Sequence, residues 1–478
     1  MTSRIDAQAS AYLLQVPLEV LTRITYYIPT VDLANVRLTC KGLESQLFNF
    51  FAYEFFRKKQ FMVSTASLQA LIDISKHATL SPFLKHVIIA TDRATGFFGG
   101  TTLDTDQKLQ FQLALADNNV LMTGVARDML AEAFSNLPNL EIVDIRDFNS
   151  LSRNRDGLGV PWRSFGSVTL ARDIGLPLTT HPILSNDVYA SSVFQQVMTA
   201  LAVAGARPKN VEVLLRNRGW GLFDWAFAIP ANHEQSLVGV LSNLKVLHLS
   251  LSVRQEPLMI RKFLSCARDI TWLRLNFSNL AALELQMVFD WLSLKEGELE
   301  DRYDTPAAAH LLVPGCAFPK LERLDIGNAD LKPSALLKTI AKFAGTLRTI
   351  SLRRLHLVDQ KNRDPALKKN PWVDFFEALV RIPGLNLRDI DLSELSHVTR
   401  NGFRGAVQFE KGGKPARNVR YDTKTSTLPT VIQGAIDGMT ADWPYIPPPD
   451  VHHGSGDDDD DEDHEDDEDD EDDDMDDA

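Results

Sequence analysis

The chain has 478 residues, of which 44% are hydrophobic and 24% are charged, and its formal net charge is −14. That apolar fraction is large enough for a folded core, which excludes a mostly disordered protein. The cysteines at 40, 266 and 316 are odd in number and far apart. This excludes a disulfide framework and a zinc-type cysteine pair, and it favours a reducing compartment, the cytosol or the nucleus.

The first informative segment, 16–56, predicts three short amphipathic helices. Pro17 suits the start of a helix, and Leu18, Leu21, Ile24 and Ile28 follow on one helical face. Pro29 ends that helix, and Thr30 is expected to cap the next. The second and third helices are marked by two further sets of apolar residues, which are Leu33, Val36 and Leu38, then Leu43, Leu47, Phe51 and Phe55. Three helices this short leave apolar surface that needs a partner. The alternative is an ordinary helical cap on a larger fold.

The middle of the chain repeats the pattern L-x-x-L-x-L, which predicts strands. It begins at residues 84, 140, 244, 270, 321, 347 and 387, with a weaker instance at 211–214. Two pairs of successive starts are 26 residues apart, within the leucine-rich-repeat period of about 20–29. Helical patterns lie between them, at 194–203, 259–266, 336–343 and 372–380. The expected fold is α/β, an irregular leucine-rich-repeat-like solenoid over 58–400, and the alternative is a doubly wound α/β domain.

Residues between the inward leucines are expected to line the concave face of this solenoid. The candidate substrate-facing residues are Trp272, Arg274, Asn276, Arg323, Asp325, Ser351 and Arg353. The same rule places His86, Ile88, Asp144, Arg146, His248, Ser250, Asp389, Asp391 and Ser393 on that face. Arg274, Arg323 and Arg353 suggest a ladder suited to an acidic or phosphorylated segment. The alternative is solvated strand ends without a ligand.

The order of residues in the N-terminal segment resembles the F-box. The matching residues are Val16-Pro17-Leu18-Glu19-Val20-Leu21, Ile24, Ile28-Pro29, Asp32-Leu33 and Leu38-Thr39-Cys40-Lys41. Val16 replaces the usual Leu, and Gly42-Leu43 stand where an aromatic residue often follows the Lys. The resemblance implies docking onto a Skp-type adaptor, and through it a cullin scaffold. The implied adaptor-binding residues are Pro17, Leu18, Glu19, Leu21, Ile24, Leu33, Val36 and Leu38.

A second stretch, 145–167, looks like an insertion seen in filamentous-fungal F-box proteins with degenerate leucine-rich repeats. Its Gly, Asn and Arg content predicts an ordered surface loop within an insertion at about 146–192. The whole resemblance covers roughly residues 12–400. The expected organisation is a disordered N-terminus (1–11), an F-box (12–57), the repeat domain (58–400), a C-terminal cap with a linker (401–450), and a disordered acidic tail (451–478). Within the cap, residues 405–409 are expected to form a strand.

The acidic tail dominates the net charge. Between 457 and 478 only His464, Met475 and Ala478 are not acidic. Removing those 19 carboxylates from the chain's 64 leaves 45 acids against 50 lysines and arginines, a net of about +5. The tail is either solubilising or binds a basic partner such as histones, or folds back on positive patches of the body. It disfavours direct nucleic-acid binding by that segment, because phosphates repel it.

No site for catalysis, metal or cofactor emerges from the sequence. The cysteines lack a nearby His, and the 96–100 segment lacks the Gly-Lys-[Ser/Thr] that cradles phosphate. His452-His453 beside the carboxylates fixes no ligand geometry. Apolar runs at 193–205 and 220–230 are interrupted by polar residues and are shorter than the roughly 20 residues of a membrane span. With no secretory signal expected either, the sequence predicts a soluble protein of the cytosol or nucleus.

The combined expectation is a non-catalytic substrate receptor of a Skp–cullin–F-box ubiquitin ligase, with the F-box holding the adaptor and the repeats holding a protein substrate. Two alternatives remain open at this stage: a non-degradative F-box scaffold, and an acidic-tail histone-binding factor. The sequence leaves open the substrate, any dependence on phosphorylation, and the choice between nucleus and cytosol.

Overall fold

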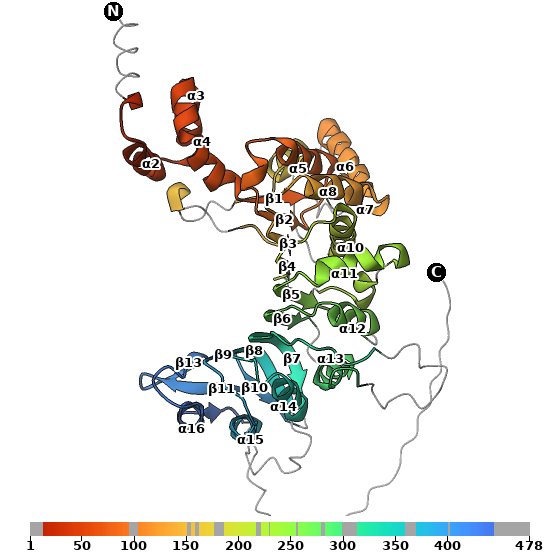
Figure 1. The fold of residues 1–478 in the computed structure, drawn as a ribbon, viewed down its shortest axis with the longest axis vertical. Coiled ribbons are helices and arrows are strands. Elements are labelled where there is room, and N and C mark those ends of the chain that lie inside the picture. The colour runs from red at the N-terminus through yellow and green to blue at the C-terminus, as the bar shows by residue number, and fades with distance from the viewer. Residues whose placement is uncertain are drawn as a thin grey trace, which may run out of the picture. The chain divides into compact units, whose positions relative to one another are not determined.

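The computed structural model (Figure 1) describes residues 13–94, 104–150, 154–157, 162–175, 186–216, 221–228, 230–254, 257–278, 283–298, 313–358, 370–399 and 402–443. The described residues, which end at 443, belong to one compact unit. The predicted disordered N-terminus (1–11) and acidic tail (451–478) lie outside the described residues.

Three helices open the described chain, as predicted. They are α2 (Leu18–Tyr27), α3 (Thr30–Thr39) and α4 (Lys41–Phe56). Pro17 and Pro29 sit immediately before the first two, where a proline's missing N–H costs no helical hydrogen bond. Their shared core consists of Leu21, Leu33, Leu43, Leu47 and Phe55. The expected cap was wrong, since Thr30 is the first residue of α3 and caps nothing with its side chain.

The next nine strands form a parallel ladder. They are β1 (Lys58–Met62), β2 (His86–Ala90), β3 (Ile142–Arg146), β4 (Asn210–Leu214), β5 (Val246–Leu251), β6 (Trp272–Phe277), β7 (Arg323–Leu331), β8 (Thr349–Val358) and β9 (Asp389–Ser393). Each pairs in parallel with the next along the chain. All eight predicted strand segments are confirmed. The order never reverses, whereas a doubly wound sheet requires a reversal.

Helices cover one face of these strands. The main ones are α5 (Thr65–Lys76), α6 (Thr105–Asp117), α7 (Asn119–Met122), α8 (Val125–Ser135), α9 (Ser167–Ile174), α10 (Asn186–Ala204), α11 (Glu234–Leu241), α12 (Leu258–Ser265), α13 (Leu283–Ser293), α14 (Pro333–Lys342) and α15 (Pro371–Val380). Figure 1 shows α5, α8, α10, α11 and α12 on the same side of the strands. The repeat leucines point into this layer; Leu247 and Leu273 are fully buried in the main core.

The last described part ends the sheet with strands that pair mostly antiparallel, although β10 also pairs in parallel with β8. It comprises β10 (Ser396–Val398), β11 (Arg404–Lys411), β12 (Lys414–Ala416), β13 (Asn418–Asp422), α16 (Leu428–Asp437) and β14 (Thr440–Ala441). The strand predicted at 405–409 lies within β11. Because β13 pairs antiparallel with β9, the last parallel strand has a covered edge.

The structure is thus mixed α/β with a mostly parallel 14-stranded sheet. Among the described residues, no helix combines the length and the apolar character that crossing a membrane requires.

A polar cluster lies where β7, β8 and β10 meet. His356 is the register partner of both Asp330 and Ser396, and its Nδ1 shares a hydrogen bond with the Ser396 hydroxyl. Burial, and to a smaller extent the positive charge of Arg404, lower the pKa of His356 to about 4. Arg404 itself pairs with Asp330 at 2.9 Å. His356 is therefore neutral in the folded protein at neutral and mildly acidic pH.

This burial predicts acid sensitivity. Because the folded pKa of His356 is about 4 and the ordinary value is 6.5, unfolded chains take up the proton first as pH falls from about 6.5 to 4. The stability advantage of wild type over His356→Asn should shrink over that window by about 1–3 kcal/mol. Urea unfolding at pH 7.0, 5.5 and 4.5 measures it. Both proteins keep Asp330, so its own titration largely cancels; a pH-independent difference would contradict the prediction.

Candidate protein-interaction surfaces

The helices α2 and α3 carry an exposed apolar surface. Leu18 and Ile24 on α2 are each 49% exposed, and Leu38 on α3 is 83% exposed. Pro17 and Glu19 are exposed beside them, Val36 is half-buried, and Leu21 and Leu33 are buried in the helical core. The eight residues implied by the F-box resemblance thus divide into a surface set and a supporting set.

Four further apolar residues enlarge this surface. They are 49–71% exposed and were not among the predicted adaptor-binding residues: Val20, Tyr26, Tyr27 and Val31. The sequence could have indicated them, because they are apolar residues that lie outside the inward-facing apolar stripe of each helix. Exposed apolar residues gathered on two successive helices are typical of a protein-binding site. We call these four residues with Leu18, Ile24 and Leu38 the helical patch.

The turn between α2 and α3 is held by residues far away in the sequence. Asp156 accepts hydrogen bonds from the backbone N–H of Thr30 at 2.8 Å and from its hydroxyl at 2.7 Å. Arg155 donates to the carbonyl oxygens of Thr25 at 3.0 Å and Ile28 at 3.4 Å. Asp156 satisfies an N–H that the helix cannot pair itself, and a carboxylate there also suits the helix dipole. This pair replaces the cap expected from Thr30.

Arg155 is itself deeply enclosed. Its side chain is 2% exposed, lies 3.5 Å from the Glu54 carboxylate, and sits over the rings of Phe50 and Phe55. The segment 154–157 therefore locks all three N-terminal helices to the insertion. This part of the insertion was predicted to be an ordered surface loop. Arg155 and Asp156 within it hold the N-terminal helices in place, and we call these two residues the brace.

The insertion also covers part of the sheet face that the sequence reading left open. Gln60 of β1 donates to Ser164 Oγ at 3.0 Å, and its carbonyl accepts from Phe165 N–H at 2.8 Å. On this face Ile88 and Asp144 are fully buried. Arg146, His248 and Ser250 are also buried, so these five residues contribute little exposed surface to the face on which they were predicted to lie.

The seven candidate substrate-facing residues do lie together. The register of β6, β7 and β8 places Arg274, Asp325 and Ser351 in one row, with Trp272 and Arg323 in the row on one side. The opposite row holds Asn276 and Arg353. Five of the seven line one groove together with Phe148, Arg216 and Ser250. The other two, Trp272 and Arg323, lie one row away from it.

Asp325 organises this group and occupies two of the predicted arginines. Its buried carboxylate lies 2.8 Å from both Arg274 Nη2 and Arg323 Nε, and it accepts from the Trp272 indole at 3.1 Å. The Arg323 guanidinium also lies 4.2 Å from the Trp272 ring centroid. The expected ladder of free arginines is therefore largely neutralised, and Arg353 is its exposed member.

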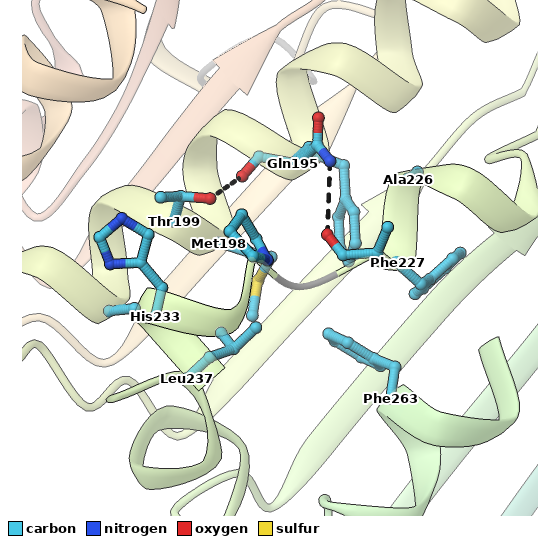
Figure 2. Close-up of a pocket in the computed structure, with 12 residues that line it drawn as sticks. Gln195, Met198, Thr199, Ala226, Phe227, His233, Leu237 and Phe263 are labelled. Atoms are coloured by element: carbon cyan, nitrogen blue, oxygen red, sulfur yellow. Dashed lines mark hydrogen bonds between the residues drawn. The ribbon is translucent and has the colours of Figure 1, made fainter. Parts of the chain in front are cut away.

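A second, small pocket lies among the helices (Figure 2). Figure 2 shows Met198, Phe227, Leu237 and Phe263 around it, with Thr199 and Gln195 above. Thr199 donates to the Gln195 carbonyl at 2.8 Å, and Gln195 donates to that of Ala228 at 3.3 Å. The polar atoms are thus bonded to each other, and Phe227 packs edge-on to Phe263 at 5.1 Å. We interpret it as a gap in helix packing.

Metal-binding clusters and activated thiols are two kinds of reactive site that can be checked in the described residues. The described residues contain no group of three or more His, Cys, Asp or Glu placed to hold a metal ion. Burial raises the pKa of Cys316 to about 11 and also raises that of Cys266, so neither is a ready thiolate nucleophile. The 96–100 segment and His452-His453 lie outside the described residues.

Comparison with known proteins adds no relative. No family model matches the chain, and a search of curated proteins gives no significant match.

The Asp156 brace predicts local protection of the α2–α3 turn. Asp156→Ala should speed hydrogen–deuterium exchange of the Thr30 amide by about fivefold or more, because a lost carboxylate cap typically costs about 1 kcal/mol. Mass spectrometry of peptides spanning 25–33 measures this. The control is Asp173→Ala, which removes an exposed carboxylate whose ion-pair partner among the described residues is its neighbour Arg172. Equal exchange in both variants would show that the brace contributes nothing.

Proposed function

We propose that this chain is an F-box protein, the substrate-recognition subunit of a Skp–cullin–F-box ubiquitin ligase. The observation that carries the proposal is the helical patch. It is an exposed apolar surface on the two helices whose residue order resembles the F-box, and it has Pro17 and Glu19 at its margin. Docking of a Skp-type adaptor would bury apolar area that the described chain leaves in water.

The division of the eight motif residues supports this assignment. Leu21 and Leu33 hold the helices together, which leaves Leu18, Ile24 and Leu38 free to contact a partner. In ordinary folding of a short helical cap, residues of this size would face the sheet-and-helix core. Here the helices keep a separate core of their own.

The repeat part is proposed to be a degenerate leucine-rich-repeat solenoid that binds a protein substrate. Strands in unbroken chain order, with buried leucine, isoleucine or valine side chains facing the helices on one side, support that assignment. The substrate would lie on the other face, where Trp272, Arg274 and Arg353 gather. Aromatic and arginine side chains dominate the binding energy of protein interfaces.

The proposed role needs no active site in this chain. A receptor that holds a target lysine near a charged conjugating enzyme accelerates transfer by proximity. The partners proposed are the adaptor, through it a cullin, and a protein substrate, in the cytoplasm or the nucleus.

The helical patch predicts adaptor binding that is sensitive to small changes. Pro17→Ala combined with Leu18→Ala should weaken binding to a purified Skp-type adaptor at least tenfold. Apolar side chains at the centre of an interface often contribute 1 kcal/mol or more each, and a loss of about 1.4 kcal/mol of binding free energy corresponds to a tenfold loss of affinity. Isothermal titration calorimetry and co-purification measure it. The matched control is Leu109→Ala with Leu113→Ala, which removes two similarly exposed leucines (53% and 55%) from α6.

Each result has a defined meaning. Pro17 and Leu18 are both exposed, so their replacement should not unfold the chain. An unchanged thermal midpoint of the double variant checks this. Loss of binding in the patch variant and retention in the control supports the proposal. Absence of binding by the wild-type chain, or equal loss in both variants, would reduce the three helices to a structural cap and remove the ubiquitin-ligase assignment.

A further inference from the structure

A basic cavity opens on the sheet face at the amino ends of the first strands. It is bounded by the end of α4, by the start of β1, β2 and β3, and by the insertion. Its lining residues are Tyr53, Glu54, Arg57, Lys58, Lys85, His86, Glu141, Ile142, Arg146, Phe148, Asn149, Ser150, Trp162, Leu214 and Arg216. The insertion covers part of this face and leaves the cavity open beside it.

Positive charge prevails in this cavity. Five of its lining residues are lysine or arginine and two are glutamate. The two glutamates are engaged: Glu141 accepts from Lys85 at 2.9 Å, and Glu54 lies beside the buried Arg155. The Lys85 charge is therefore balanced within the cavity, whereas those of Arg57, Lys58 and Arg216 have no described carboxylate at ion-pair distance.

Lys58 is the most informative of these cations. Its side chain is half-buried, and the nearby positive charge of Arg146 acts on it. Burial lowers the pKa of Lys58 and Arg146 lowers it further, and these effects outweigh the carboxylates of Asp144 and Glu212, which raise it. A half-buried ammonium group beside a guanidinium is unfavourable in the empty protein, and an anion in the cavity would relieve that cost.

The arginines are fixed in place before any ligand arrives. The Arg216 guanidinium lies 3.5 Å from the Phe148 ring centroid, and its backbone N–H is held by Asp147 at 2.8 Å. Arg57 lies over the Tyr53 ring and bonds to its hydroxyl. Cations held by aromatic stacking lose little freedom on binding, which favours affinity.

The cavity continues along the sheet face. Phe148, Leu214 and Arg216 line both this cavity and the groove that holds Arg274, Ser351 and Arg353. From β1 to β8 there are seven strand spacings, about 34 Å at about 4.8 Å each. An extended polypeptide of about ten residues spans that length.

We infer that this continuous surface binds an acidic segment of a partner polypeptide, about ten residues long, through its aspartate and glutamate side chains. The cations are spread over separate strands and do not converge on one point, so they match a series of single charges. The fork of Arg146 is already occupied by Asp144, which leaves it poorly placed to clamp one phosphate group.

This site does not require the adaptor. Under the proposed function its occupant would be the recruited substrate, and only that identification rests on the proposed function. The helical patch and the cavity use different residues, so the two are tested separately.

The experiment titrates the full-length chain into a fluorescein-labelled Glu-Ser decapeptide, (Glu-Ser)₅, and follows fluorescence anisotropy. The comparison probes are (Gln-Ser)₅ and a decapeptide with one phosphoserine among Gln and Ser residues. Affinity for the glutamate probe should be at least tenfold higher than for the glutamine probe, and it should fall as salt rises. A chain ending at residue 456 is titrated in parallel, because 19 carboxylates per molecule compete with the probe in solution.

Matched variants locate the site. Lys58→Gln with Arg216→Gln should weaken binding of the glutamate probe at least tenfold. Arg172→Gln with Arg381→Gln makes the same change in net charge at side chains that are 76% and 77% exposed, and it should leave affinity within twofold. Arg57→Gln, at an exposed residue, provides a second cavity variant if the first lowers the thermal midpoint.

Three results would overturn the inference. They are equal affinity for the glutamate and glutamine probes in both chain lengths, equal weakening by the cavity and control variants, and binding of the phosphoserine probe alone. Adaptor affinity is measured on the same proteins. The cavity variant should keep it and the Pro17/Leu18 variant should keep the peptide, so failure of one proposal is distinguishable from failure of the other.

Discussion

The parallel backbone ladder from β1 to β9 is the constraint on which the rest of the structure depends. Each strand pairs with the next along the chain, so one register is carried across nine strands. Alternate residues then face opposite sides: Leu273 and Leu324 enter the helical core, while Arg274 and Asp325 face away from it. A shift of one residue would exchange those two sets, which fixes the register strongly. The composition of the functional face is therefore a consequence of the burial of the leucines.

The insertion converts that ladder into a support for the N-terminal helices. Gln60 and Ser164 attach it to the edge strand, and a few residues earlier Asp156 binds the start of α3. The helices that carry the helical patch thus have a small core of their own, and polar contacts at specific atoms connect them to the insertion and the sheet. In a receptor, such a connection would limit the freedom between the adaptor-binding part and the part that holds a substrate, which favours transfer by proximity.

Electrostatics on the open face follow from which acids are already engaged. Asp325 neutralises two arginines, and Asp144 is buried against His86 and Arg146. Excess positive charge remains at Lys58, Arg57 and Arg216, around the cavity that the insertion leaves open. Counting arginines along the strands did not show that Asp325 neutralises two of them, because a count does not reveal which carboxylate lies across the next strand.

The sequence by itself determined the elements and their inward residues: the proline-bounded helices, the seven leucine patterns and the strand at 405–409 all follow from spacings of a few residues. It missed β1, whose segment lacks that leucine pattern, and it misassigned the cap of α3. Only the tertiary structure decided that Asp156 meets Thr30 across 126 residues, that Asp325 occupies Arg274 across 51, and that Ile88 and Asp144 are covered. The reason is physical: local periodicity reports burial against an unspecified core, whereas the pairing of side chains depends on strand register and on where an irregular insertion crosses the sheet.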